Sequence, residues 1–116
     1  MNYTRVYNMR FGDVYPLLVA KAEKKNRTAA EVMQVTTWLT GYTEAEILQA
    51  IAQGTNYEDF FNHAPAMNPN RKLITGKICG VQVDTIEDPV YQAVRYLDKL
   101  VDELAKGKAM ERILRK

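Results

Sequence analysis

At 116 residues, 47% hydrophobic and 26% charged, the chain has the size and composition of one globular domain, which excludes an intrinsically disordered protein. Its 16 lysines and arginines exceed its 14 acidic residues by only two, so net charge alone does not indicate a polyanionic partner. The single cysteine, Cys79, excludes an intrachain disulfide, and we find neither a signal-peptide core nor an apolar run of the roughly 18 residues that a membrane span needs. We therefore expect one cytoplasmic domain over residues 1–116, without contact to a membrane.

The first quarter of the chain predicts one helix. Asp13 can cap a helix over Val14–Lys25, with Pro16 in the opening turn, where its missing N–H costs little. Apolar residues recur at helical spacing on one side of this helix, namely Phe11, Tyr15, Leu18 and Ala22. Before the helix, an alternating pattern allows a short additional strand through Tyr3, Arg5, Tyr7 and Met9.

Two helices follow, and the same capping-box pattern opens both. Thr28 precedes a helix over Ala29–Thr40, and Thr43 precedes one over Glu44–Gln53; each threonine has a glutamate three residues later. A shorter helix is expected over Tyr57–His63, since Pro65 ends the pattern there.

The stretch Leu73–Ile86 changes to an alternating pattern, which predicts an antiparallel hairpin that turns at Cys79-Gly80. In this register, one apolar face carries the opposed pairs Ile78 with Val81, Gly76 with Val83, and Ile74 with Thr85. Cysteine is unusual at the first position of a two-residue turn, where asparagine, aspartate or glycine is the common residue.

A long helix from Asp88-Pro89 to Gly107 is the most clearly marked element, because aspartate caps helices well and proline fits the first helical position. Its apolar residues fall within an arc of about 120°. That arc is wider than a coiled-coil seam, which favours burial in the chain's own core, with a dimer using part of it as the alternative. A short basic helix is expected over Lys108–Arg115. The predicted fold class is α+β, predominantly helical, with four to six helices and one small antiparallel hairpin.

Cys79 and His63 are the residues best suited to catalysis, but no local motif fixes a reaction. A Cys-His pair would need both side chains together with a third group to orient the imidazole. Paired ligand spacing such as C-x-x-C is absent, so we predict no metal, no cofactor and no catalytic residue. An enzyme or small-ligand site near Cys79, built with His63, Arg71 and Tyr96, remains an alternative.

Nucleic-acid binding is a second alternative. The helices over 29–40 and 44–53 have the outline of a helix-turn-helix, but the second contains no lysine or arginine to face phosphates. A basic patch in the C-terminal tail is the better candidate, formed by Lys106, Lys108, Arg112, Arg115 and Lys116. It would extend further if folding gathers Arg5, Arg10, Lys21, Lys24 and Lys25 onto the same face.

Trp38 lies off the apolar stripe of its helix by a quarter turn or more, which suggests a core edge or a contact surface. Tyrosine and tryptophan are enriched at interfaces, and we predict an interaction surface formed by Trp38, Tyr42, Arg71 and Tyr96. The first hypothesis is therefore a non-enzymatic domain that self-associates or binds another protein.

Short strings along nearly the whole chain resemble the bacterial domain of unknown function 2200 family. They include Arg5-Val6-Tyr7, Trp38-Leu39-Thr40-Gly41-Tyr42, Asn68-Pro69-Asn70-Arg71, Ile86-Glu87-Asp88-Pro89 and Arg95-Tyr96-Leu97-Asp98-Lys99-Leu100. The resemblance implies an uncharacterised bacterial cytosolic protein. It implies no assigned activity, so it brings no catalytic or binding residues with it.

Overall fold

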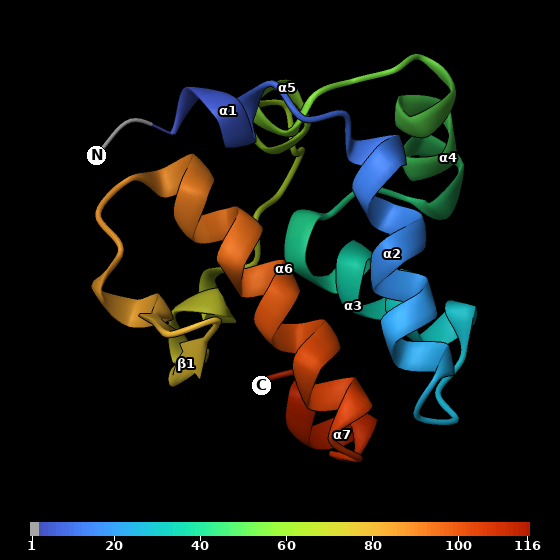
Figure 1. The fold of residues 1–116 in the computed structure, drawn as a ribbon, viewed down its shortest axis with the longest axis vertical. Helices are drawn as coiled ribbons and strands as arrows, with labels where there is room; N and C mark the ends of the chain where they lie inside the picture. The colour runs from blue at the N-terminus through green and yellow to red at the C-terminus, as the bar shows by residue number, and fades with distance from the viewer. Residues whose placement is uncertain (1–2) are drawn as a thin grey trace.

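A computed structural model describes residues 3–116, and helices dominate this part of the chain (Figure 1). Its α-helices are α1 (Thr4–Tyr7), α2 (Phe11–Glu23), α3 (Ala29–Thr40), α4 (Glu44–Ala52), α5 (Tyr57–Asn62), α6 (Pro89–Ala105) and α7 (Met110–Ile113). Two 3-10 helices, η1 (Pro69–Leu73) and η2 (Val83–Thr85), flank the strands β1 (Lys77–Ile78) and β2 (Val81–Gln82). The predicted class, predominantly helical α+β with one small antiparallel hairpin, is confirmed, but the described residues form seven α-helices where four to six were predicted, because one-turn helices such as α1 were not anticipated.

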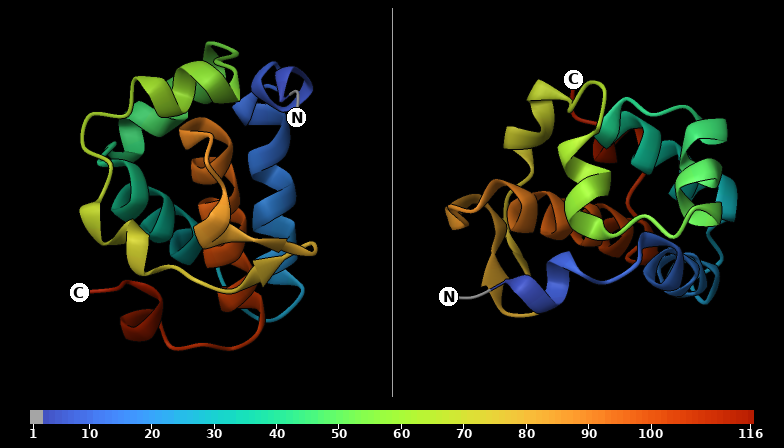
Figure 2. Two further views of the ribbon diagram at one scale, coloured as in Figure 1. Left: turned by 90° about the vertical axis from the view of Figure 1, so that its left-hand side faces the viewer. Right: turned by 90° about the horizontal axis from the view of Figure 1, so that it is seen from above.

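The long helix α6 lies at the centre of the fold. Helices α2 and α3 pack along it, α5 and η2 contact its N-terminal part, and α7 folds back against its end (Figures 1 and 2). The predicted apolar arc of α6 is buried inside the chain, with Leu97, Leu100, Val101 and Leu104 fully inaccessible to solvent. The wide apolar face of α6 is therefore buried in the chain's own core and does not form an open coiled-coil seam.

Both predicted capping boxes are present. The Thr28 hydroxyl accepts from the Glu31 N–H at 3.1 Å, and the Glu31 carboxylate accepts from the Thr28 N–H at 2.9 Å. Thr43 and Glu46 repeat this arrangement at the start of α4. Between the two helices, Gly41 has a φ of 78°, and a Cβ there would lie 2.8 Å from Ala66. Glycine is needed at this position because no other residue fits both the left-handed backbone and the close neighbour.

The predicted strand through Tyr3 and Met9 is wrong, because residues Thr4–Tyr7 form the one-turn helix α1. The turn brings the rings of Tyr3 and Tyr7 to 6.3 Å from each other, whereas a strand would separate positions four apart by about 13 Å. Both rings can therefore reach the start of α6. Tyr3 stacks on Tyr91 at 4.1 Å, and the Tyr7 hydroxyl donates to the Asp88 carboxylate.

Helix α2 begins at Phe11, three residues before the predicted start, so Asp13 is a first-turn residue and not the cap. The reason is tertiary. The Phe11 N–H donates to the carbonyl of Thr55, and the Tyr57 N–H donates to the carbonyl of Met9, each at 2.9 Å. This backbone bridge pairs the first N–H group of α2, so the helix begins there without a side-chain cap.

The hairpin is shorter than predicted. Ile78 pairs with Val81 as expected, and Cys79 and Gly80 form the turn with φ angles of 50° and 78°, the left-handed pair of a type I′ turn. The predicted pair of Ile74 with Thr85 is wrong, because the chain leaves the ladder at Val83 and winds into η2. Ile74, Ile78 and Val83 are nevertheless buried, so the predicted apolar face is the one that packs against the core.

Candidate functional site

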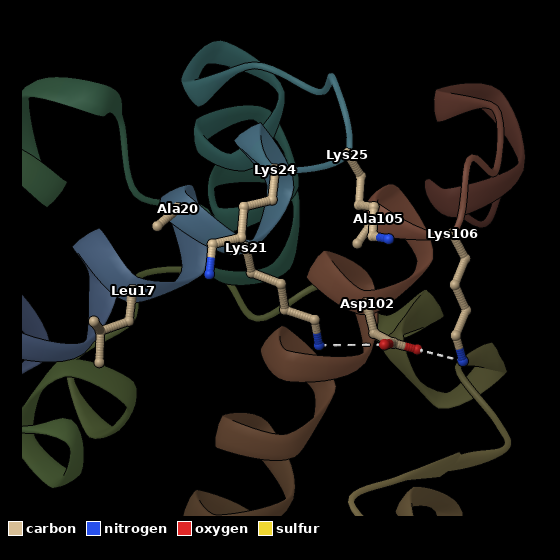
Figure 3. Close-up of a pocket in the computed structure, with 8 residues that line it drawn as sticks. All are labelled: Leu17, Ala20, Lys21, Lys24, Lys25, Asp102, Ala105 and Lys106. Carbon is tan, nitrogen blue, oxygen red and sulfur yellow. Dashed lines mark ion pairs between the residues drawn. The ribbon is translucent and has the colours of Figure 1, made fainter.

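A groove of about 600 Å³ lies between the C-terminal halves of α2 and α6 (Figure 3). We call it the lysine groove. Its lining comes from α2 and the turn after it, and from the last turn of α6: Leu17, Ala20, Lys21, Lys24, Lys25, Asp102, Ala105 and Lys106. Four ammonium groups against one carboxylate give this groove a charge of +3 on a chain whose net charge is only +2.

Asp102 organises the groove from its floor. Asp102 is only 8% exposed, and its two carboxylate oxygens point toward lysines on opposite sides (Figure 3). Lys21 Nζ lies 3.2 Å from Oδ1, and Lys106 Nζ lies 3.0 Å from Oδ2. Burial acts to raise the pKa of Asp102, but the ammonium groups of Lys106 and Lys21 outweigh it, and the pKa is lowered. The carboxylate therefore stays ionised and holds both lysines at the groove.

Lys24 and Lys25 complete the groove without being neutralised. Within residues 3–116, no ion pair involves either of these two side chains. Between the lysines the surface is apolar, and Leu17 is 67% exposed at one end. A patch that combines free positive charge with exposed apolar surface suits a ligand that is acidic and amphipathic.

The C-terminal end of α6, which forms one side of the groove, is fixed by Arg27. Its guanidinium donates to the carbonyl oxygens of Leu104 and Lys108 at 3.2 and 2.8 Å. It also donates through Nε and Nη2 to Glu31, in the first turn of α3. A positive group at the carbonyl end of a helix satisfies unpaired acceptors and opposes the negative end of the helix dipole.

Comparisons with known proteins match this chain over almost its full length. The model of a bacterial family, described as "Uncharacterized protein conserved in bacteria (DUF2200)", matches residues 5–115. The chain belongs to this family. The predicted family is thus confirmed, and its description names no activity.

One solved structure, the "Crystal structure of uncharacterized protein SP1917", is similar to this chain. The two sequences are 49% identical, the match covers 98% of this chain and 93% of that chain, and the TM-score is 0.91. A comparison with curated proteins finds no match.

The predicted basic patch of the tail is split by the fold. Lys106 belongs to the lysine groove, whereas Arg115 makes a two-pronged ion pair with the buried Glu103 at 2.6 and 2.7 Å. Lys108 lies 3.4 Å from the same carboxylate. Arg112 and Lys116 remain exposed at the end of the chain. Two of the five tail cations thus neutralise a buried carboxylate.

The predicted aromatic surface is only partly accessible. Trp38, Tyr42 and Arg71 are half-buried, whereas Tyr96 is buried. The Tyr42 hydroxyl donates to the carbonyl of Phe60 at 2.7 Å, and the Arg71 guanidinium donates to the carbonyl of Asn68 at 2.9 Å. These side chains stabilise local structure as well as reaching the surface.

The residues considered for chemistry are spread over separate places. Cys79 is exposed at the hairpin turn, and His63 lies at the C-terminal end of α5, where it lines a hollow with Tyr42 and Asp59. That hollow includes neither Cys79 nor Tyr96. Among the described residues, no group of three histidine, cysteine or acidic side chains is arranged to hold a metal ion. Over the same part of the chain, the helices lack the combination of length and apolar character that crossing a bilayer requires.

Asp102 and Glu103 are charged residues of the long helix, and nothing in the sequence predicted that both are buried. A partial signal for the groove was available. Lys21, Lys24 and Lys25 follow the spacing i, i+3, i+4, so they share one side of a helix, and Asp102 and Lys106 are likewise four apart. Nothing in the spacing joins the two sets, which are about eighty positions apart in the chain.

Proposed function

We propose that this protein is a non-enzymatic binding protein whose lysine groove takes an acidic, amphipathic segment of a protein partner. The observation that carries the proposal is the arrangement around Asp102. One buried carboxylate holds Lys21 and Lys106 on opposite sides, while Lys24 and Lys25 keep their full charge beside exposed apolar surface. A helix with acidic residues around an apolar stripe complements both features.

A protein segment fits the groove better than a nucleic acid does. Single-stranded nucleic acids bind where aromatic side chains stack on bases beside a basic track, and no aromatic residue lines this groove. Bidentate arginine contacts to bases or phosphates have no counterpart here, because all the cations that line it are lysines. The exposed Leu17 offers apolar contact instead.

The partner segment can also come from a second copy of the chain, which would make the protein self-associating. Helix α4 carries Glu44 and Glu46 with Leu48, which is 52% exposed, and it contains no basic residue. Docking α4 of one copy in the lysine groove of another is a head-to-tail contact, so it leads to rings or open chains instead of a two-fold dimer. Light scattering over a dilution series tests this form, and Leu48→Glu should abolish any concentration-dependent rise in mass.

A cytoplasmic location is part of the proposal. The free thiol of Cys79 is exposed at the hairpin turn, where an oxidising compartment would cross-link it between molecules. A reducing compartment keeps such a thiol intact.

The experiment is a titration with a labelled 15-residue helical peptide that carries glutamates around a leucine stripe. In the double variant Lys24→Glu, Lys25→Glu, the affinity should fall at least about tenfold, because repulsion replaces attraction at two positions. Both residues are exposed and outside any ion pair of the described residues, so the fold should not change. Binding by the wild type should weaken as salt is raised.

Lys72→Glu, Lys116→Glu is the matched control, since it makes the same change in net charge at exposed positions that do not line the groove. It should reduce the affinity much less. Equal losses in the two double variants would show that only overall charge matters and would refute the groove. A single-stranded oligonucleotide of the same charge that bound more tightly than the peptide would favour the nucleic-acid alternative.

A further inference from the structure

A second hollow borders α2 away from the lysine groove, and we call it the α4 hollow. Its volume is about 410 Å³, and it shares no lining residue with the groove. Its walls come from α2, from the start of α3 and from α4: Tyr15, Ala29, Ala30, Met33, Glu44 and Leu48. All of these side chains except that of Glu44 offer apolar or aromatic surface, so the hollow suits an exposed apolar side chain.

Each of these two surfaces carries an exposed leucine. Leu17, in the lining of the lysine groove, is 67% exposed, and Leu48, in the lining of the α4 hollow, is 52% exposed. Both leucines would be stabilised by contact with apolar surface on another molecule.

The charges beside the two leucines are opposite and have the same spacing. Lys21 follows Leu17 by four positions in α2, and Glu44 precedes Leu48 by four positions in α4, so each pair shares one side of its helix. If the two helices pack antiparallel with leucine against leucine, Lys21 lies against Glu44. A parallel arrangement with the same leucine contact would instead place Lys21 beside Ala52 and lose the opposite charge.

The charged groups needed for this contact are available. Within residues 3–116, no ion pair involves Glu44 or Lys24. Glu46, by contrast, is used inside α4, because its carboxylate accepts from the Thr43 N–H at 2.8 Å. Lys24 lies one turn beyond Lys21, so it adds a second positive charge on the side that would face Glu44.

We propose that the partner of the lysine groove is a second copy of this chain, whose α4 packs antiparallel to α2 with Leu17 seated in the α4 hollow. This inference rests on the proposed function, because it uses the same groove and names its occupant. Tyr15 and Leu17 are two positions apart in α2 and point about 200° away from each other, so one molecule cannot bring its own two surfaces together. Each copy therefore takes one neighbour on each surface, and the assembly is head-to-tail.

The test uses two variants that each lose one of the two surfaces, Leu17→Glu and Leu48→Glu. Each change places a carboxylate in the apolar contact, so each variant alone should self-associate at least about tenfold more weakly than the wild type. An equimolar mixture of the two should form a dimer and nothing larger, because each variant keeps the surface that the other lacks. Sedimentation velocity of the wild type, of each variant and of the mixture at equal total concentration measures this. Glu44→Lys in place of Leu48→Glu should act in the same way, since it reverses the charge that faces Lys21.

Leu73→Glu is the matched control, because Leu73 is 54% exposed and lines neither surface. It should self-associate like the wild type. A wild type that stays monomeric, a mixture that stays monomeric, or a mixture that grows beyond a dimer would each overturn this inference.

The acidic helical peptide separates this inference from the proposed function. Leu48→Glu leaves the lysine groove intact, so this variant should bind the peptide as tightly as the wild type does. Peptide binding together with a monomeric mixture would refute the second copy and leave another protein as the occupant of the groove. Absence of both would refute the proposed function as well.

Discussion

Asp102 shows how one residue can determine the character of a surface. A buried carboxylate is costly by itself, but here its two oxygens face two lysines from different parts of the chain. The lysines remain largely solvated, with side chains 43% and 70% exposed, so each ion pair is individually weak. Together the two ion pairs hold the ammonium groups of Lys21 and Lys106 in place beside Lys24 and Lys25.

The lowered pKa of Asp102 makes its contribution to stability dependent on pH. The folded state binds the proton less readily than the unfolded chain, whose carboxyl has the ordinary value of 3.8. The contribution is therefore complete above that pH and is lost as the pH falls toward the lowered value. Asp102→Asn should reduce the free energy of unfolding by about 1 kcal/mol at pH 7, and by clearly less at pH 3.

Urea unfolding at the two pH values measures this difference. Asp84→Asn is the control, because Asp84 is exposed and no lysine or arginine pairs with it among the described residues. It should change stability little at either pH. A loss for Asp102→Asn that was equal at pH 3 and pH 7 would contradict the ionised, paired carboxylate.

At the scale of elements, local signals predicted some boundaries and missed others. The starts of α3, α4 and α6 were predictable because each is set by a cap within a few residues, such as Thr28 or Asp88. The start of α2 was not, because a backbone bridge to the segment before α5 replaces the cap. Helix α1 was missed for the same reason, since its aromatic contacts with α6 outweigh an alternating pattern.

Arg27 is the residue that joins two elements around the groove, and its geometry depends on a planar guanidinium. It donates to Glu31 at the start of α3, to the carbonyl of Leu104 in the last turn of α6 and to the carbonyl of Lys108 just beyond that helix. A lysine has a single ammonium and cannot serve both ends at once. Arg27→Lys should therefore lower the free energy of unfolding by about 1–2 kcal/mol, whereas Arg112→Lys at an exposed position should change it little.

Thermal unfolding of the two variants makes the comparison. An unchanged free energy of unfolding in Arg27→Lys would indicate that arginine at this place matters only for its charge, since lysine keeps the positive charge. With Arg27→Lys, peptide binding should weaken as well, because the end of α6 carries Asp102, Ala105 and Lys106, which form one side of the groove.

At the scale of the whole molecule, the site depends on contacts that no local pattern contains. The sequence allowed for Lys21, Lys24 and Lys25 joining the basic tail on one face, and the structure does bring them beside Lys106. The sequence could not show which cations of the C-terminal tail would form ion pairs away from this face. Arg115 and Lys108 neutralise the buried Glu103, and that choice follows from how α7 folds back on α6.

The most direct test of the lysine groove is to locate the bound peptide. Amide chemical shifts of the wild type should be followed as the acidic amphipathic peptide is added. The largest changes should cover residues 17–25 and 102–106, the two segments that line the groove. Changes concentrated in residues 108–116, or around Trp38 and Tyr42, would contradict the proposal that this groove is the binding site.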